Sequence, residues 1–350
     1  MDKQLFQACL NGNVEKVKEL LQSSEIDINW QDPEHNYLTP LLIACDYGHF
    51  EIVKLLLNNQ RVDVNKENKW YGKTPLYIAC ERGHIDIVKL LLNDERIDVN
   101  KANEYDPTPF WIACEKGHIE IVKLLLKDER VNINKAENYS RTPLYIACEH
   151  GHIEIVKLLL KDERVNINKA HRDETTPFYI ACNYGEIEIV KLLLNDERTD
   201  VNKEENQGRT PFYVACHEGH IEIVKLLLND KRVDDINGTN YGVTPFYIAC
   251  NYGNIEIVEY LLASGRDLNL TNRDVETAIN IAKRGATEEG GEDDIDRQEM
   301  KERYQKIVQL LELFEKKPIE TRTKLGIQLG FAGKFLSYFF IFITSFLISF

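Results

Sequence analysis

The stretch that decides the fold is TPFWIACEKGHIEIVKLLLKDERVNINK, residues 108–135, which recurs along the chain with few changes. Its opening Thr-Pro pair returns once after 35 residues and five times after 34, beginning at Thr39, Thr74, Thr108, Thr142, Thr176, Thr210 and Thr244. A fixed period of this size indicates stacked supersecondary units rather than one globular core. Such a stack offers long recognition surfaces and seldom a catalytic pocket.

Each unit is expected to contain two helices. Thr108 can cap the first helix with its hydroxyl, Pro109 suits the first helical position, and Gly117 signals its end. The second helix is predicted at residues 118–126, where the polar residues share one narrow stripe and the rest of the circumference is apolar. Residues 128–134 alternate in polarity and predict an extended arm. Because both helices are short, neighbouring copies must stabilise them.

The consensus of these copies, Thr-Pro-Leu-x-x-Ala, Gly-His-x-x-Ile-Val-x-Leu-Leu and Asp-Val-Asn, resembles the ankyrin repeat over residues 1–315. The resemblance implies an all-α solenoid of about nine helix-turn-helix units, each preceded by a hairpin finger. One departure is that an aromatic residue replaces the usual His of the first helix at Tyr77, Trp111, Tyr145, Tyr179, Tyr213 and Tyr247.

The ends of the chain differ from its middle. We expect an N-terminal capping repeat over residues 1–35, seven repeats over residues 36–273, and a degenerate C-terminal capping repeat over residues 274–317. The last of these begins at Thr277, reaches Gly285, and is then interrupted by an acidic stretch that we interpret as a solvated loop. Helical spacing resumes at Tyr304.

Composition narrows the function. A net charge of −14 argues against nucleic-acid binding, which requires a basic surface. The chain shows no glycine loop for phosphate and no nucleophile motif, and His217-Glu-Gly-His220 is one residue short of a zinc-protease motif. We therefore expect no enzyme activity, cofactor or metal.

All eight cysteines follow the Ala of a first helix. At this register they lie too far apart for disulfides and should be buried free thiols, which favours a cytoplasmic repeat domain. They are Cys9, Cys45, Cys80, Cys114, Cys148, Cys182, Cys216 and Cys250.

Two variable places indicate where a protein partner of a monomeric solenoid would bind. They are the four residues before each Thr-Pro and the pair after each Ala-Cys; the resemblance places both on the concave face. Drift at unconstrained surface positions is the alternative. The candidate partner-binding residues are Trp70, Tyr71, Lys73, Tyr105, Tyr139, Arg141, Tyr47, Arg82, Lys116, Tyr184, Arg209, Tyr241 and Tyr252. By the same resemblance, Asn65, Asn100 and Asn202 are candidates for hydroxylation by cytosolic oxygenases.

Residues 318–350 form a hydrophobic tail. The last sixteen residues carry no charge, and a helix from Phe331 to Phe350 would reach about 30 Å if Lys334 snorkels. We expect a C-terminal transmembrane anchor that tethers the repeats to an intracellular membrane. Two alternatives remain open, a tail that packs on the last repeat of a soluble adaptor and a misassigned 3′ sequence.

Overall fold

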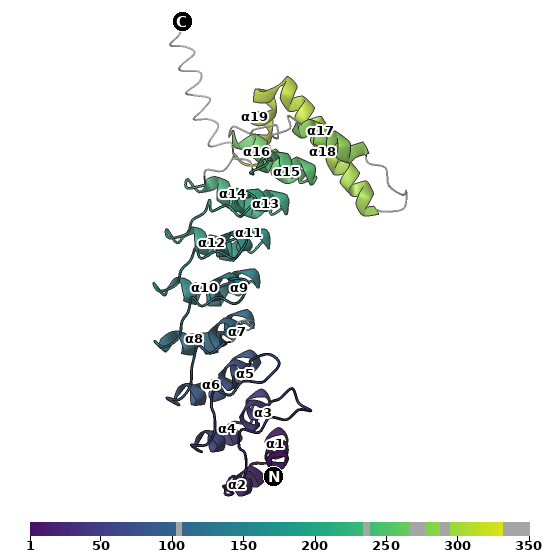
Figure 1. Cartoon of the computed structure of the whole chain (residues 1–350). Helices are drawn as coiled ribbons and strands as arrows, with labels where there is room; N and C mark the ends of the chain where they lie inside the picture. The colour runs from purple at the N-terminus through teal and green to yellow at the C-terminus, as the bar shows by residue number, and fades with distance from the viewer. Residues whose placement is uncertain (103–106, 234–238, 266–276, 288–294, 332–350) are drawn as a thin grey trace. The chain divides into compact units, whose positions relative to one another are not determined.

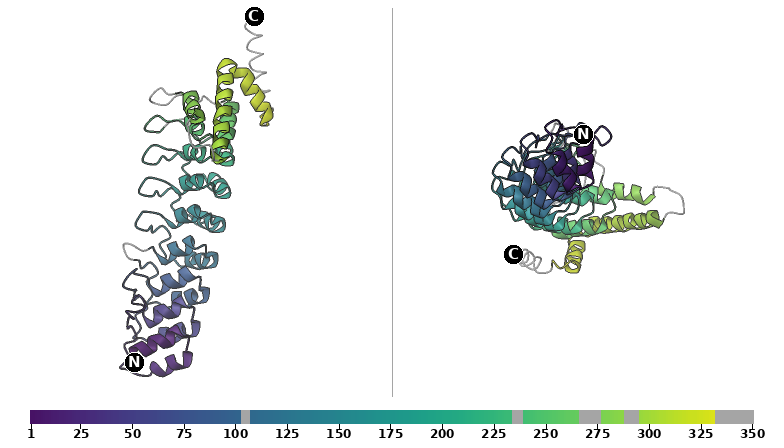
Figure 2. Two further views of the ribbon diagram at one scale, coloured as in Figure 1. Left: turned by 90° about the vertical axis from the view of Figure 1, so that its right-hand side faces the viewer. Right: turned by 90° about the horizontal axis from the view of Figure 1, so that it is seen from below.

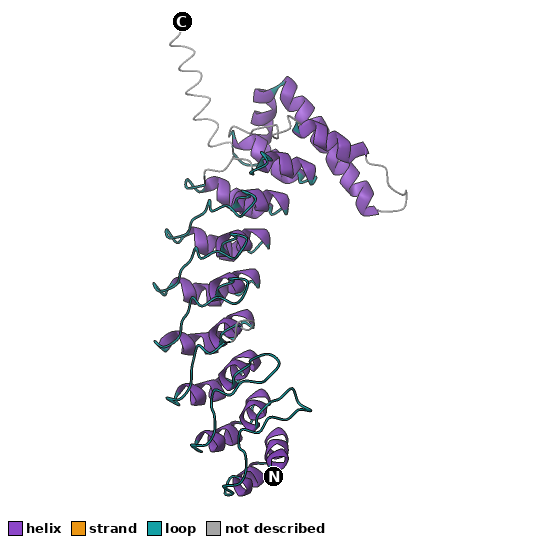
Figure 3. Cartoon of the chain, viewed as in Figure 1, coloured by secondary structure: helices purple, strands orange, loops and turns teal. Residues whose placement is uncertain are grey.

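The computed structural model describes residues 1–102, 107–233, 239–265, 277–287 and 295–331, and the side chains from residue 297 in the last range. Within these ranges all regular secondary structure is helical, and no strand is present (Figure 3). The residues fall into two compact units, Met1–Arg172 and Asp173–Phe350.

The first unit is a stack of five helix pairs. Odd-numbered helices pack on the next odd-numbered helix, and even-numbered helices do likewise, so each pair covers its neighbour (Figures 1 and 2). Its helices are α1 (Asp2–Leu10), α2 (Val14–Leu20), α3 (Pro40–Asp46), α4 (Phe50–Leu57), α5 (Pro75–Arg82), α6 (Ile85–Leu92), α7 (Pro109–Glu115), α8 (Ile119–Lys127), α9 (Pro143–Glu149) and α10 (Ile153–Leu160).

The second unit continues the pattern with three pairs and ends in three further helices. The longest, α18, packs against α17, and α19 packs against α16. Its helices are α11 (Pro177–Asn183), α12 (Ile187–Leu194), α13 (Pro211–His217), α14 (Ile221–Asn229), α15 (Pro245–Asn251), α16 (Ile255–Ser264), α17 (Ala278–Thr287), α18 (Ile295–Lys316) and α19 (Pro318–Gln328).

The predicted start of the first helix is confirmed. The hydroxyl of Thr108 accepts a hydrogen bond from the backbone N–H of Trp111, 3.2 Å away, and Pro109 occupies the first helical turn. Each of the other six Thr-Pro pairs caps its helix in the same way. Gly117 follows the helix with a φ of +73°, a conformation that favours glycine.

The second helix is less deeply buried than its composition suggests. In α8, Ile121, Val122 and Leu125 are buried, whereas Ile119 and Leu124 are only half-buried. The helix therefore buries one broad face against its neighbours rather than most of its circumference.

The cysteines are all free and buried, as predicted. Burial raises the pKa of Cys9 to about 12, because a thiolate there would lose its hydration. Cys45 and Cys80 shift in the same direction for the same reason. These thiols act as small apolar residues at the centre of the helix pairs.

The C-terminal cap differs from the expectation in helix length. Helix α18 begins at Ile295, well before Tyr304, because the intervening residues are strong helix formers and Glu299 pairs with Arg303 one turn later. Helix α17 passes through Gly285 to Thr287. The acidic stretch at residues 288–294 lies outside the described residues.

The described start of the tail packs on the last regular repeat. Arg322 donates from Nε to the backbone oxygen of Leu262 at 3.2 Å, Leu325 is buried, and the ring of Phe331 lies 4.8 Å from that of Tyr260. No described helix is long and apolar enough to cross a bilayer. Residues 332–350, on which the predicted anchor depends, lie outside the described part of the chain.

Candidate functional site

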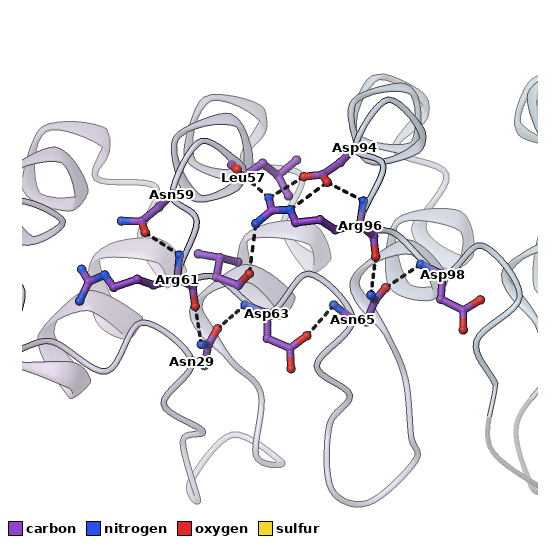
Figure 4. A network of polar contacts seen from close by, with 10 residues as sticks. Asn29, Leu57, Asn59, Arg61, Asp63, Asn65, Asp94, Arg96 and Asp98 are labelled. Carbon is purple, nitrogen blue, oxygen red and sulfur yellow. Dashed lines mark hydrogen bonds and ion pairs between the residues drawn. The ribbon is translucent and has the colours of Figure 1, made fainter.

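In the first unit, a row of asparagine side chains joins successive repeats (Figure 4). Asn65 donates from Nδ2 to the backbone oxygen of Arg96 at 2.7 Å, and its Oδ1 accepts from the N–H of Asp98 at 2.9 Å. Asn29 and Asn100 make the same pair of bonds one repeat earlier and later. Both polar ends of each amide are therefore used between repeats.

A row of arginines runs beside the asparagines (Figure 4). The Arg96 guanidinium binds both oxygens of Asp94, at 2.9 and 2.6 Å, and donates to the backbone oxygen of Leu57 at 2.8 Å. The hydrogen bond from Arg96 lowers the pKa of Asp94. Arg130 repeats this arrangement with Asp128 and Leu92. The recurrent Asp-Glu-Arg loop thus serves to bind the preceding repeat.

The repeat histidines position the ends of the first helices. His118 donates from Nε2 to the backbone oxygen of Glu81 at 3.1 Å, and its ring packs against Gly83. His49, His84, His152 and His220 form the corresponding bond. Because a carbonyl can only accept, Nε2 must carry the proton in each case.

Side chains help to close the loop tips before Thr-Pro, and the fingers implied by the family resemblance contain no strand among the described residues. One oxygen of Glu137 accepts from the N–H groups of Tyr139 and Arg141 at 3.0 and 3.1 Å, and Glu205 does the same in the second unit. An isolated antiparallel bridge joins Asp32 to Leu38. In both loops the carboxylate adds to a backbone hydrogen bond, from Glu137 to Arg141 at 3.2 Å and from Glu205 to Arg209 at 3.1 Å.

The first aromatic cluster lies on the tip loop of residues 68–73. Trp70 is 68% exposed and Tyr71 is also exposed. The Trp70 ring lies 6.5 Å from that of Tyr37, and the Lys69 ammonium sits 4.7 Å above the Tyr37 ring. Lys73 bonds to both oxygens of Glu81 at 2.9 Å. The cluster therefore presents exposed rings, and its lysines are partly engaged within the protein.

The second cluster centres on Tyr139, which is exposed. The guanidinium groups of Arg141 and Arg172 each lie 5.7 Å from its ring centre. Arg141 also lies 5.6 Å from the Trp111 ring and pairs with Glu137 at 3.1 Å. Arg141 is thus half-buried between two rings and a buried carboxylate, where it braces Tyr139.

The remaining candidate partner-binding residues of the first unit lie at the C-terminal ends of its first helices. Tyr47 is exposed and stacks on the ring of His49 at 6.0 Å. Arg82 pairs with Asp46 of the preceding repeat at 2.7 Å, and Lys116 pairs with the adjacent Glu115 at 2.9 Å. The two cations lie at the surface, each paired with a carboxylate of the same row.

The second unit carries the other candidate partner-binding residues. Tyr184, Tyr241 and Tyr252 are exposed, whereas Arg209 pairs with the buried Glu205 at 3.0 Å. The ring of Tyr252 lies 4.2 Å from that of His217, a contact that the sequence analysis did not anticipate.

The structure thus brings several predicted residues together and adds others. Tyr105 lies outside the described residues. Tyr37 and Lys69 were not among the candidates, although Tyr37 lies in the variable tip before Thr39. The hydroxylation of Asn65, Asn100 and Asn202 stays a prediction. In the described part of the chain, no group of three or more His, Cys, Asp or Glu side chains is arranged to hold a metal ion.

Comparison with known proteins agrees with this architecture. A family model described as ankyrin repeats (3 copies) matches residues 5–103, 95–173, 163–236 and 178–274, which together span most of the chain. A search of curated proteins found no match. The paired helices, the Thr-Pro caps and the inter-repeat histidines are what this match leads one to expect. The chain belongs to the ankyrin-repeat family.

Proposed function

We propose that this chain is a non-catalytic scaffold that binds a protein partner through its loop tips and the exposed ends of its first helices. The observation that supports this best is the exposure of Trp70, Tyr71 and Tyr139 on two tips of the first unit. Large aromatic rings left in solvent are costly unless a partner covers them, and such rings supply much of the energy of interfaces.

The bracing of these rings supports the same proposal. Tyr139 is flanked by two guanidinium groups, and the backbone of its loop is fixed by Glu137. A surface that is already ordered loses little conformational entropy when it binds, so more of the contact energy appears as affinity. The exposed tyrosines of the second unit, Tyr184, Tyr241 and Tyr252, give that unit a candidate surface of its own.

We further propose that the segment after Phe331 anchors the scaffold in an intracellular membrane, with a soluble adaptor as the alternative. Carbonate extraction of the full chain and of a truncation after Phe331 distinguishes the two. This truncation keeps α19, which packs on α16, so the repeats retain their cap. Extraction of both forms into the soluble fraction contradicts the anchor.

The binding surface is tested with partners captured by proximity labelling of the full chain. We expect the double variant Trp70→Ala/Tyr139→Ala to weaken the captured partner about tenfold or more in a pull-down titration. The control is Ile319→Ala, since Ile319 is an exposed apolar side chain on α19, which belongs to neither the loop tips nor the first helices. Equal affinity of the double variant and the wild type rejects this surface.

A further inference from the structure

A row of lysines follows the row of asparagines in the first unit. Lys101, Lys135 and Lys169 each donate from Nζ to the backbone oxygen of the asparagine one repeat earlier, at 2.9, 3.2 and 3.2 Å. Lys66 occupies the same place in its repeat, directly after Asn65. The backbone N–H of Lys66 donates to the oxygen of Asp63 at 3.3 Å. Among the described residues, however, the Lys66 ammonium group forms no hydrogen bond or ion pair, so it is available to a ligand.

Lys66 lines a hollow of about 470 Å³ at the base of the tip loop of residues 68–73. Lys69 and Lys101 line it as well, together with the carboxylates of Asp63 and Glu67. Three ammonium groups against two carboxylates leave a net positive charge, in a chain whose total charge is −14. The hollow is therefore a local exception to the charge of the protein.

The polar groups of the hollow leave donors unsatisfied. Asn68 is 3% exposed, and its Oδ1 accepts from the N–H of Lys73 at 2.8 Å, while its Nδ2 has no acceptor within the described chain. Two of the acceptors are partly engaged: one oxygen of Asp63 accepts from the N–H of Asn65 at 3.0 Å, and Glu67 lies 3.8 Å from Lys101. A nearly buried amide donor and a free ammonium group are suited to a carboxylate.

We propose that this hollow receives an aspartate or glutamate side chain of the partner, and that the partner is therefore an acidic peptide segment. The inference rests on the proposed scaffold function and names the chemistry of its ligand. Trp70 belongs to the same tip loop as the lining residues Lys69 and Gly72, and Lys69 lies over the ring of Tyr37, so we expect an apolar residue beside the acidic one. Asp63 and Glu67 disfavour a polyanion, because each additional negative charge would be repelled by them.

The test uses degenerate twelve-residue peptides with two central glutamates, titrated against the full-length chain by fluorescence anisotropy. Matched pools carry glutamine or lysine at the two central positions. We expect the glutamate pool to bind at least tenfold more tightly than the glutamine pool, and to weaken as salt is raised. Absence of glutamate-pool binding up to 1 mM, or equal binding of the two pools, overturns the proposal.

Substitutions of Lys66 test whether the glutamate pool binds at this hollow. Lys66→Gln should weaken the glutamate pool about tenfold, Lys66→Arg should retain most of the binding, and Lys66→Glu should reverse the preference toward the lysine pool. The matched control is Lys135→Gln, which removes the same charge at the same repeat position but from a side chain already bonded to Asn100. An equal loss in both glutamine variants overturns the site. Single-stranded DNA and anionic vesicles serve as competing anions, and tighter binding of either contradicts a peptide ligand.

The scaffold function and this inference fail separately. If a captured partner is lost with Trp70→Ala/Tyr139→Ala but bound normally by Lys66→Glu, the scaffold stands and the acidic contact is rejected. If no partner depends on the aromatic tips, the scaffold proposal itself is rejected.

Discussion

The hydroxyl of Tyr304 donates to the backbone oxygen of Asn251 at 2.6 Å. In the regular repeats the backbone oxygen at this position accepts a hydrogen bond from a histidine. The oxygen of Glu81, for example, accepts from His118. The Tyr304 ring also packs on Gly285 of α17. A tyrosine from the long helix α18 thus continues the histidine row at the end of the second unit.

We expect Tyr304→Phe to loosen this cap. The substitution keeps the ring but leaves the Asn251 carbonyl without its donor, which should lower the free energy of unfolding by about 1–2 kcal/mol. The matched control is Tyr241→Phe, because Tyr241 is 64% exposed and water can replace its hydrogen bonds. Hydrogen exchange should increase in α15 and α17 in Tyr304→Phe alone; equal exchange in both variants contradicts a capping role.

Gly117→Ala should destabilise the first unit by about 2 kcal/mol or more. Its φ is +73°, and an added Cβ would lie 2.8 Å from Cε1 of His152. Gly265→Ala is the control for strain without a clash, because Gly265 has a φ of +75° and nothing within 4 Å of the added atom. Urea unfolding of the two variants should show the larger loss at Gly117, and the reverse order would mean that the histidine moves aside freely.

Asn65→Ala should lower the free energy of unfolding by about 2 kcal/mol, since two hydrogen bonds between repeats are lost together. Asn58→Ala removes an exposed asparagine at the end of α4 and serves as the control. Equal midpoints of urea unfolding for both variants would show that the asparagine row contributes nothing measurable.

Acid should remove the contribution of the Asp-Arg pairs. The hydrogen bond from Arg96 holds the pKa of Asp94 below its ordinary value of 3.8, and Asp128, Asp162, Asp196 and Asp230 are lowered in the same way by their arginines. In the unfolded chain these carboxyls bind protons more readily. Their stabilisation is thus complete above about pH 5 and is lost as the pH falls through 3.8 and below.

The measurement for this effect is the stability of Asp94→Asn against pH. The variant should be less stable than the wild type near pH 7, and the two curves should converge toward pH 3. Asp86→Asn is the control, because Asp86 is an exposed side chain that pairs only with Lys89. A constant gap between Asp94→Asn and the wild type from pH 7 to pH 3 would contradict the assignment.

The repeated part of the fold could be predicted from the sequence because each copy is supported by the others. Thr108, Pro109 and Gly117 mark a helix in one copy, and six further copies repeat the signal. The C-terminal cap lacks this support. Tyr304 does not fall at the repeat spacing, since residues are inserted before it, so its role in the histidine row is visible only in three dimensions.

The candidate binding surface could likewise be predicted only in part from the sequence. Exposure of Trp70 and Tyr139 follows from their place in variable loops, and the sequence indicated both. The sequence did not predict which cations are paired with carboxylates. Arg141 and Lys73 pair with Glu137 and Glu81, and these pairs depend on the loop geometry. The sequence also did not predict that the Lys66 ammonium group lacks the bond that Lys101 forms.

The inter-repeat bonds have a consequence for synthesis of the chain. His118 reaches Glu81 across 37 residues, Arg130 reaches Leu92 across 38, and Asn65 reaches Arg96 across 31. Every partner is thus made within about one repeat of the residue that needs it. At roughly 5–20 residues per second a ribosome completes such a span in a few seconds. Within each unit a repeat can therefore lock onto its predecessor while the next is still being translated.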